Sequence, residues 1–143
     1  MFTCGIFSIF GSANMKVCLI ATILLLAFPQ IKHDTVLERL STVERFAFGP
    51  TGYAGVISPG EKDFRVVLAR STALADFEKL LATGNIQAKC YALVGIHKLS
   101  PARFKELADR LTDPKGTVTT EQGCIILRKP FSTVLKQIAA GKY

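Results

Sequence analysis

The chain has 143 residues, of which 49% are hydrophobic, and its mean hydropathy is +0.31. Basic residues exceed acidic ones, which gives a net charge of +7, and the chain has four cysteines. This composition excludes a disordered chain, a polytopic membrane protein and a cysteine-dense miniprotein. The hydrophobic excess lies at the start, where Lys16 is the only charged residue before Lys32. The remaining ~110 residues are enough for one modest core.

The first part of the chain has the pattern of a targeting segment. Val17–Phe28 is an uninterrupted run of apolar or small residues that follows Met15 and Lys16. A short basic region before an apolar core is typical of a secretory signal. An uncleaved membrane anchor is the alternative, although a spanning helix usually needs about 20 apolar residues. We predict that 1–31 is a signal peptide or membrane anchor, and that 32–143 is a single helical domain, either exported or anchored at the membrane.

Apolar periodicity and capping residues predict several short helices beyond this segment. The sequence Ser58-Pro59-Gly60-Glu61 is a helix start signal, because serine caps a helix and proline suits its first turn. Two- to three-residue links between consecutive helices favour antiparallel helical hairpins. The expected helices cover residues 35–46, 58–69, 72–82, 86–99, 101–111 and 131–140.

Two segments depart from helical periodicity. Residues 46–62 contain four glycines and two prolines, so we expect a loop or a tight non-helical segment there. The β-branched runs at 117–120 and 124–127 predict a small β-hairpin. The predicted fold is therefore mainly α, a compact bundle of short helical hairpins with one small β-hairpin before the C-terminal helix.

Three stretches of the chain carry a resemblance to a known group. Phe48–Glu61, Ala92–Gly95 and Val118–Ile125 together resemble small exported bacterial proteins of unknown function. The helix pair in 85–111, with its tight Ser-Pro link, is similar to a single HEAT-like repeat. The resemblance spans roughly Phe46–Ile138 and implies an envelope location and a helical body. It implies no catalytic residues.

The cysteines beyond the targeting segment are Cys90 and Cys124. In an exported protein they can form a disulfide that closes a loop of about 35 residues. The alternative is two separate buried thiols, because free cysteine is often a core residue. No C-x-x-C motif is present, and we do not expect the two cysteines and two histidines to form a zinc site. We therefore expect no metal and no cofactor.

Catalytic motifs are also absent from the sequence. His97 follows Cys90 by seven residues, about 10 Å along a helix, so these two cannot form a dyad directly. A thiol enzyme would need Cys124 and His97 to meet through the fold, and we interpret His97 instead as a helix-end residue. The acidic pair Glu61 and Asp63 is expected to be solvated. We predict no catalytic residues.

The glycine-rich segment is the best candidate for a contact surface. Gly52, Tyr53 and Gly55 are the predicted partner-binding residues, because long ordered glycine-rich loops often carry binding. The basic residues are interleaved with acids rather than arranged in a stripe, which argues against nucleic acid and leaves a protein or an anionic envelope surface as partner. The predicted function is an exported, envelope-associated, non-catalytic protein-binding module. The alternative is an accessory subunit held at the membrane by the N-terminal apolar helix.

Overall fold

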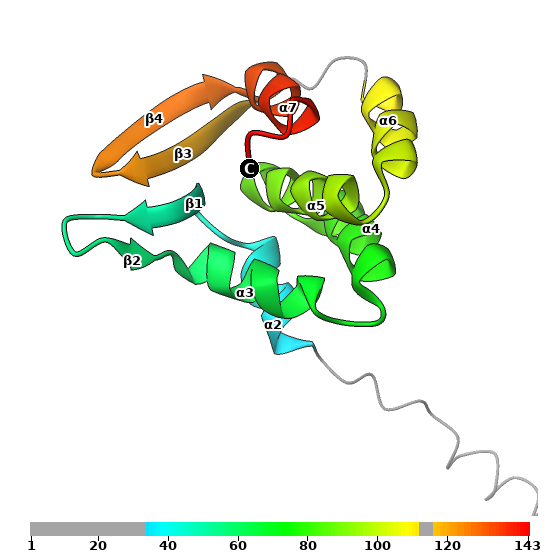
Figure 1. Cartoon of the computed structure of the whole chain (residues 1–143), viewed down its shortest axis with the longest axis horizontal. Helices are drawn as coiled ribbons and strands as arrows, with labels where there is room; N and C mark the ends of the chain where they lie inside the picture. Colours follow the sequence, from blue (N-terminus) through cyan, green and yellow to red (C-terminus); the bar gives the residue numbers. More distant parts are fainter. Residues whose placement is uncertain (1–33, 112–115) are drawn as a thin grey trace, which may run out of the picture. The chain divides into compact units, whose positions relative to one another are not determined.

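Six helices and a mixed four-stranded sheet make up the described part of the chain, residues 34–111 and 116–143 of the computed structural model (Figure 1). The helices are α2 Thr35–Ser41, α3 Pro59–Leu68, α4 Ala73–Thr83, α5 Ile86–Leu99, α6 Pro101–Arg110 and α7 Phe131–Ala139. The strands are β1 Phe46–Thr51, β2 Val56–Ile57, β3 Thr117–Gly123 and β4 Ile125–Pro130. The predicted signal or anchor segment lies outside the described residues. Among the helices that are described, none has the length and hydrophobicity needed to cross a bilayer.

The helix predictions are confirmed, with shifts of a few residues at the ends. Ser58 accepts a hydrogen bond from the Glu61 N–H at 3.1 Å, so the predicted serine cap of α3 is formed. Helix α2 ends at Ser41 rather than at Phe46, because Phe46 is already the first residue of β1.

The sheet joins strands from the two ends of the domain. Its strand order is β2-β1-β3-β4, in which β1 and β3 are parallel and the two outer pairs are antiparallel. Phe46 of β1 lies opposite Thr120 of β3, although α3, α4, α5 and α6 all lie between these strands in the sequence. The sheet therefore depends on contacts between distant parts of the chain.

The prediction of a helical bundle with one small β-hairpin is wrong. The hairpin is present as β3 and β4, but it is only half of the sheet. The segment 46–62, which we expected to be a loop or a tight non-helical segment, supplies β1 and β2 and the start of α3. Strand β1 is held by hydrogen bonds to β3, and local periodicity carries no signal of such a distant partner.

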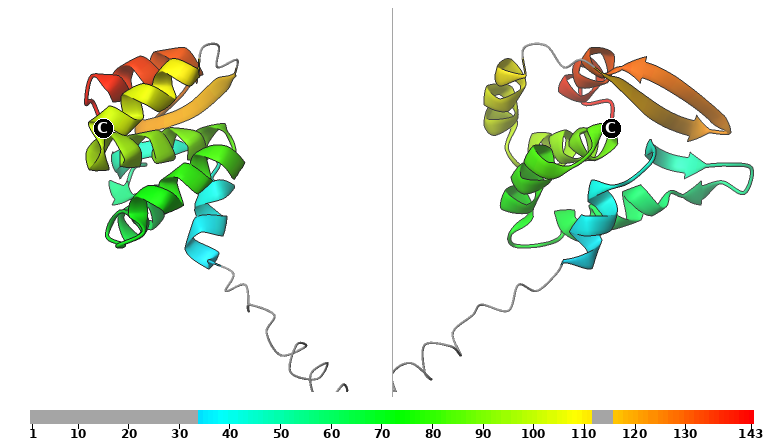
Figure 2. Two further views of the ribbon diagram at one scale, coloured as in Figure 1. Left: turned by 90° about the vertical axis from the view of Figure 1, so that its right-hand side faces the viewer. Right: turned by 180° about the vertical axis from the view of Figure 1, so that it is seen from behind.

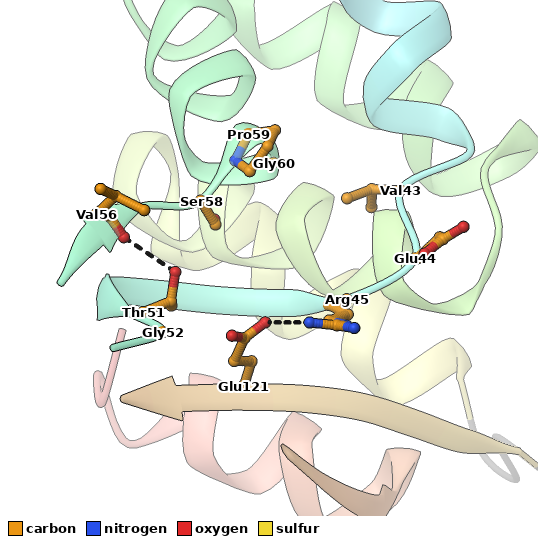
Figure 3. A pocket seen from close by; sticks show the side chains of 10 residues that line it. All are labelled: Val43, Glu44, Arg45, Thr51, Gly52, Val56, Ser58, Pro59, Gly60 and Glu121. Carbon is orange, nitrogen blue, oxygen red and sulfur yellow. Dashed lines mark hydrogen bonds and ion pairs between the residues drawn. The ribbon is translucent and has the colours of Figure 1, made fainter. Parts of the chain in front are cut away.

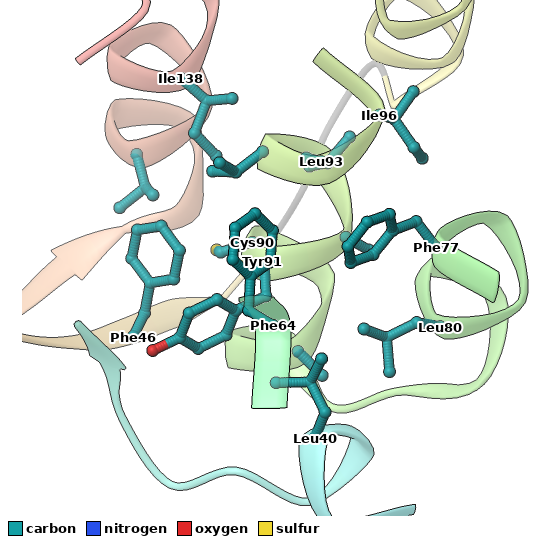
Figure 4. Close-up of a cluster of buried hydrophobic side chains, with 14 of the residues drawn as sticks. Leu40, Phe46, Phe64, Phe77, Leu80, Cys90, Tyr91, Leu93, Ile96 and Ile138 are labelled. Carbon is teal, nitrogen blue, oxygen red and sulfur yellow. The ribbon is translucent and has the colours of Figure 1, made fainter. Parts of the chain in front are cut away.

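Helix α5 forms the centre of the core (Figure 4). Residues 90–96 are all buried, as expected for a stretch without charge. A Cβ at Gly95 would lie 2.4 Å from the Phe77 ring, so the glycine permits the close approach of α4. The rings of three phenylalanines lie around Tyr91 with centroid distances of 5.0–5.9 Å, and these are Phe46, Phe48 and Phe64. The sheet face that carries Phe46 thus packs on α5.

Candidate functional site

The β1–β2 turn contains the three predicted contact residues. Gly52 and Gly55 have positive φ angles of 68° and 61°, which glycine adopts without strain. The Gly55 N–H donates to the Gly52 carbonyl at 3.2 Å. Tyr53, between them, is fully exposed. The turn therefore holds an aromatic side chain in solvent on a hydrogen-bonded backbone.

The turns of the two hairpins are linked. The Gly52 N–H donates to the Gly123 carbonyl at 2.8 Å, and Thr51 lies opposite Gly123 in the β1–β3 register. Figures 1 and 2 show the two hairpins side by side, with their turns at the same end of the sheet. This end, which we call the hairpin end, comprises the turn Gly52–Gly55 and the turn at Gly123 and Cys124 with the strand residues beside them. Residues from both halves of the chain thus form one surface.

A pocket of about 450 Å³ opens beside the β1–β2 turn (Figure 3). Its walls combine residues before β1, both strands of the first hairpin, the start of α3 and one residue of β3. These residues are Val43, Glu44, Arg45, Thr51, Gly52, Val56, Ser58, Pro59, Gly60 and Glu121. A smaller hollow of about 100 Å³ lies on the other face of the sheet and is partly lined by Ile125 and Leu127.

Several polar groups in the pocket wall already have partners. Arg45 and Glu121 form an ion pair at 3.0 Å, which Figure 3 shows across the sheet. The Thr51 hydroxyl donates to the Val56 carbonyl at 2.9 Å. The Ser58 hydroxyl caps α3 and donates to the Ala47 carbonyl at 3.4 Å. These groups shape the wall, and the pocket mainly offers apolar surface and one ion pair to a ligand.

Glu61 follows the pocket residue Gly60 and binds strand β1, a role that the sequence did not indicate. We expected this carboxylate to be solvated, but the residue is buried. Its side chain accepts the Gly49 N–H at 2.7 Å and forms an ion pair with Arg65 at 2.6 Å. The expectation was wrong because the β1–β3 register shifts between Ala47 and Thr51, and the Gly49 N–H within this irregularity donates to Glu61.

Tyr91 connects the core to the same strand. Its hydroxyl donates to the Ala47 carbonyl at 2.8 Å and accepts the Ala47 N–H at 3.0 Å. Burial raises the pKa of the Tyr91 phenol, and the hydrogen bond with Ala47 offsets part of this effect. The phenol therefore stays neutral and acts as a structural hydrogen-bonding group.

The thiols and the histidine that we considered for catalysis are not brought together. Cys90 is buried in α5, where burial raises the pKa of its thiol, while Cys124 is exposed in the β3–β4 turn. Both are free, so the disulfide left open by the sequence is not formed in this structure. His97 packs its ring against Phe104 of α6, at a centroid distance of 4.8 Å. Helix α6 and the β3–β4 turn lie at opposite sides of the domain in Figure 1, so His97 and Cys124 do not form a dyad.

Metal chemistry and similarity to other proteins give no indication of the function of this site. Within residues 34–111 and 116–143, no group of three or more His, Cys, Asp or Glu side chains is arranged to hold a metal ion. Comparison of the chain with protein-family models, with curated proteins and with solved structures gave no match.

The β1–β2 turn was predictable from the sequence, but the pocket was not. Arg45 and Glu121 meet only because β1 and β3 pair, so neither residue carries a local signal. One signal was present in β4, where Ile125, Ile126 and Leu127 follow one another without the alternation of a half-buried strand. Such a run indicates either a strand buried on both faces or one with an exposed apolar face, and the structure shows the second.

Proposed function

We propose that this domain is a non-catalytic protein-binding module whose partner docks at Tyr53 and the adjacent pocket. The observation that carries the proposal is a fully exposed tyrosine next to a concave, largely apolar surface. Tyrosine offers a large contact area at a small cost in side-chain entropy, and it is enriched among the residues that dominate binding energies. Because the turn is already tied to Gly123, little ordering is needed on binding.

The pocket gives this surface its selectivity. Its volume of about 450 Å³ accommodates a large apolar side chain of a partner. Val43, Val56 and Pro59 supply apolar contacts, and the Arg45–Glu121 ion pair offers both a donor and an acceptor at one wall. An apolar anchor residue with a polar neighbour is therefore the partner chemistry that fits.

The proposal includes export to the cell envelope. Its basis is the apolar run Val17–Phe28 after Lys16, in the order of a secretory signal. The alternative is an accessory subunit that the same segment, uncleaved, holds at the membrane. The intact mass of the protein from its own cell distinguishes the two, since cleavage removes about 30 residues.

Photo-crosslinking tests the binding site. With p-benzoylphenylalanine in place of Tyr53, we expect a protein adduct in intact cells. The matched control is the same group at Val66 of α3, which is 51% exposed and does not line the pocket. We expect at least tenfold less adduct from position 66, and loss of the position-53 adduct when Val56→Trp fills the pocket. Equal adducts from both positions, or none from position 53, would overturn the proposal.

A further inference from the structure

Strand β4 has an unpaired edge. It is the last strand of the sheet and pairs with β3 along Ile125–Pro130, and no other described strand lies beside it. The backbone N–H and C=O groups that point away from β3 are therefore available to another strand. An edge of this kind is a template for strand addition.

The apolar side chains of β4 are concentrated in one half of this edge. Ile125, Ile126 and Leu127 are 62%, 49% and 49% exposed. Successive strand residues point to opposite faces, so apolar surface is exposed on both faces of the sheet. The other half carries Arg128, Lys129 and Pro130, and charges and proline are the features that protect an edge from pairing. Only the first half of β4 is thus open to pairing.

We propose that two copies of this chain associate through antiparallel pairing of β4 with β4, with the two-fold axis at Ile126. In an antiparallel pair, opposite residues either both point their backbone groups at each other or both point them away. The two-fold axis must therefore relate one residue of β4 to the same residue of the second copy, and it cannot lie at a position between two residues. The candidate positions are Ile125, Ile126 and Leu127.

The side chains select Ile126 among these positions. An axis there places Ile126 opposite itself and Ile125 opposite Leu127 of the second copy, so every apolar residue has an apolar partner. An axis at Leu127 would place Ile126 opposite Arg128. An axis at Ile125 would place Ile126 opposite Cys124, in the turn.

Charge is compatible with this register. With the axis at Ile126, Arg128 lies opposite the small, uncharged Cys124 of the second copy. The two Arg128 residues are then four positions apart along the strands, about 14 Å. This separation exceeds the screening length of about 8 Å at physiological ionic strength, so their repulsion is weak. The resulting sheet is continuous across both copies, and β2 is the outer edge strand in each copy.

Cysteine crosslinking tests the register in the full chain. In a background with Cys4, Cys18 and Cys124 changed to serine, we expect Ile126→Cys to form a disulfide-linked dimer under mild oxidation. Residues on the axis have Cβ atoms about 4.5–5.5 Å apart, within reach of a disulfide. The control keeps the native Cys124 in place of the new cysteine. Its two copies lie about 14 Å apart in this register, so we expect no crosslink.

Sedimentation equilibrium tests the association itself. We expect a concentration-dependent doubling of mass, and at least tenfold weaker association for Ile126→Lys, which places two like charges opposite each other. Tyr53→Ala is expected to leave the association unchanged, so this test is independent of the protein-binding site. A monomer at every concentration, an undiminished dimer in Ile126→Lys, or an equal crosslink from Cys124 would overturn the proposal. A monomer at every concentration would leave an acidic extended segment of another protein, or a bilayer, as the occupant of this edge.

Discussion

The α4–α5 pair and the hairpin end differ in what covers their apolar side chains. Around α5, phenylalanine rings, leucines and the Tyr91 ring are fully enclosed, and Gly95 brings α4 into close contact (Figure 4). At the hairpin end, Tyr53, Val56 and the apolar residues of β4 are exposed, while a backbone hydrogen bond ties the β1–β2 turn to Gly123. The close packing around α5 stabilises the folded domain. The second region is held by hydrogen bonds but leaves its apolar side chains exposed to solvent.

The largest expected effect comes from truncating a buried side chain, and the same change at the hairpin end should have little effect. Leu93 is fully buried in α5, so Leu93→Ala should lower the free energy of unfolding by about 2–5 kcal/mol. Tyr53→Ala removes a larger side chain at the hairpin end. It should nevertheless change the free energy of unfolding by less than about 0.5 kcal/mol, since Tyr53 is fully exposed. Urea denaturation of both variants measures the difference. A comparable loss in the two variants would refute the division into a stabilising core and an uncovered surface.

A smaller effect is expected where the two regions meet. Tyr91→Phe removes the hydroxyl that bonds Ala47 of β1 and leaves the buried Ala47 N–H without that acceptor. The expected destabilisation is about 1–3 kcal/mol, with faster hydrogen exchange at the β1 amides. Tyr143→Phe is the control, since its hydroxyl donates to the half-buried Gln137 side chain at 2.7 Å and not to the backbone. If Tyr143→Phe lost as much stability as Tyr91→Phe, the destabilisation could not be assigned to the hydrogen bonds between Tyr91 and β1.

The smallest effect concerns the border of the helical region. Asp34 caps α2 and forms an ion pair with Arg70, and the hydrogen bond from Arg70 lowers the pKa of Asp34 below its usual 3.8. Because the folded-state pKa is the lower one, this contribution is present above about pH 4 and is lost as the pH falls through the folded-state value.

The corresponding variant is Asp34→Asn, which retains a good helix cap but loses the ion pair. It should cost less than about 1 kcal/mol at pH 7, because both side chains are partly exposed. Urea denaturation at several pH values should show the difference from the unmodified protein shrinking below pH 4. A difference that stayed constant to pH 2 would show that the carboxylate charge is not its source.

Some features of this protein were determined by its sequence alone. The start of α3 at Ser58 and the β3–β4 hairpin were both predictable. Each of these features is formed by residues that are close in the sequence. Capping residues, periodicity and β-branching therefore indicate them directly. The turn with Gly52, Tyr53 and Gly55 was recognisable for the same reason, because glycine marks positions of positive φ.

Only the tertiary structure decided the sheet and the pocket. The pairing of β1 with β3, the burial of Glu61 and the Arg45–Glu121 ion pair all join residues whose partners lie in other elements. The same holds for the two thiols, which the fold places in a buried helix and an exposed turn. The element that packs beside a residue determines its backbone partner and its degree of burial. Neighbouring residues in the sequence do not indicate which element this will be.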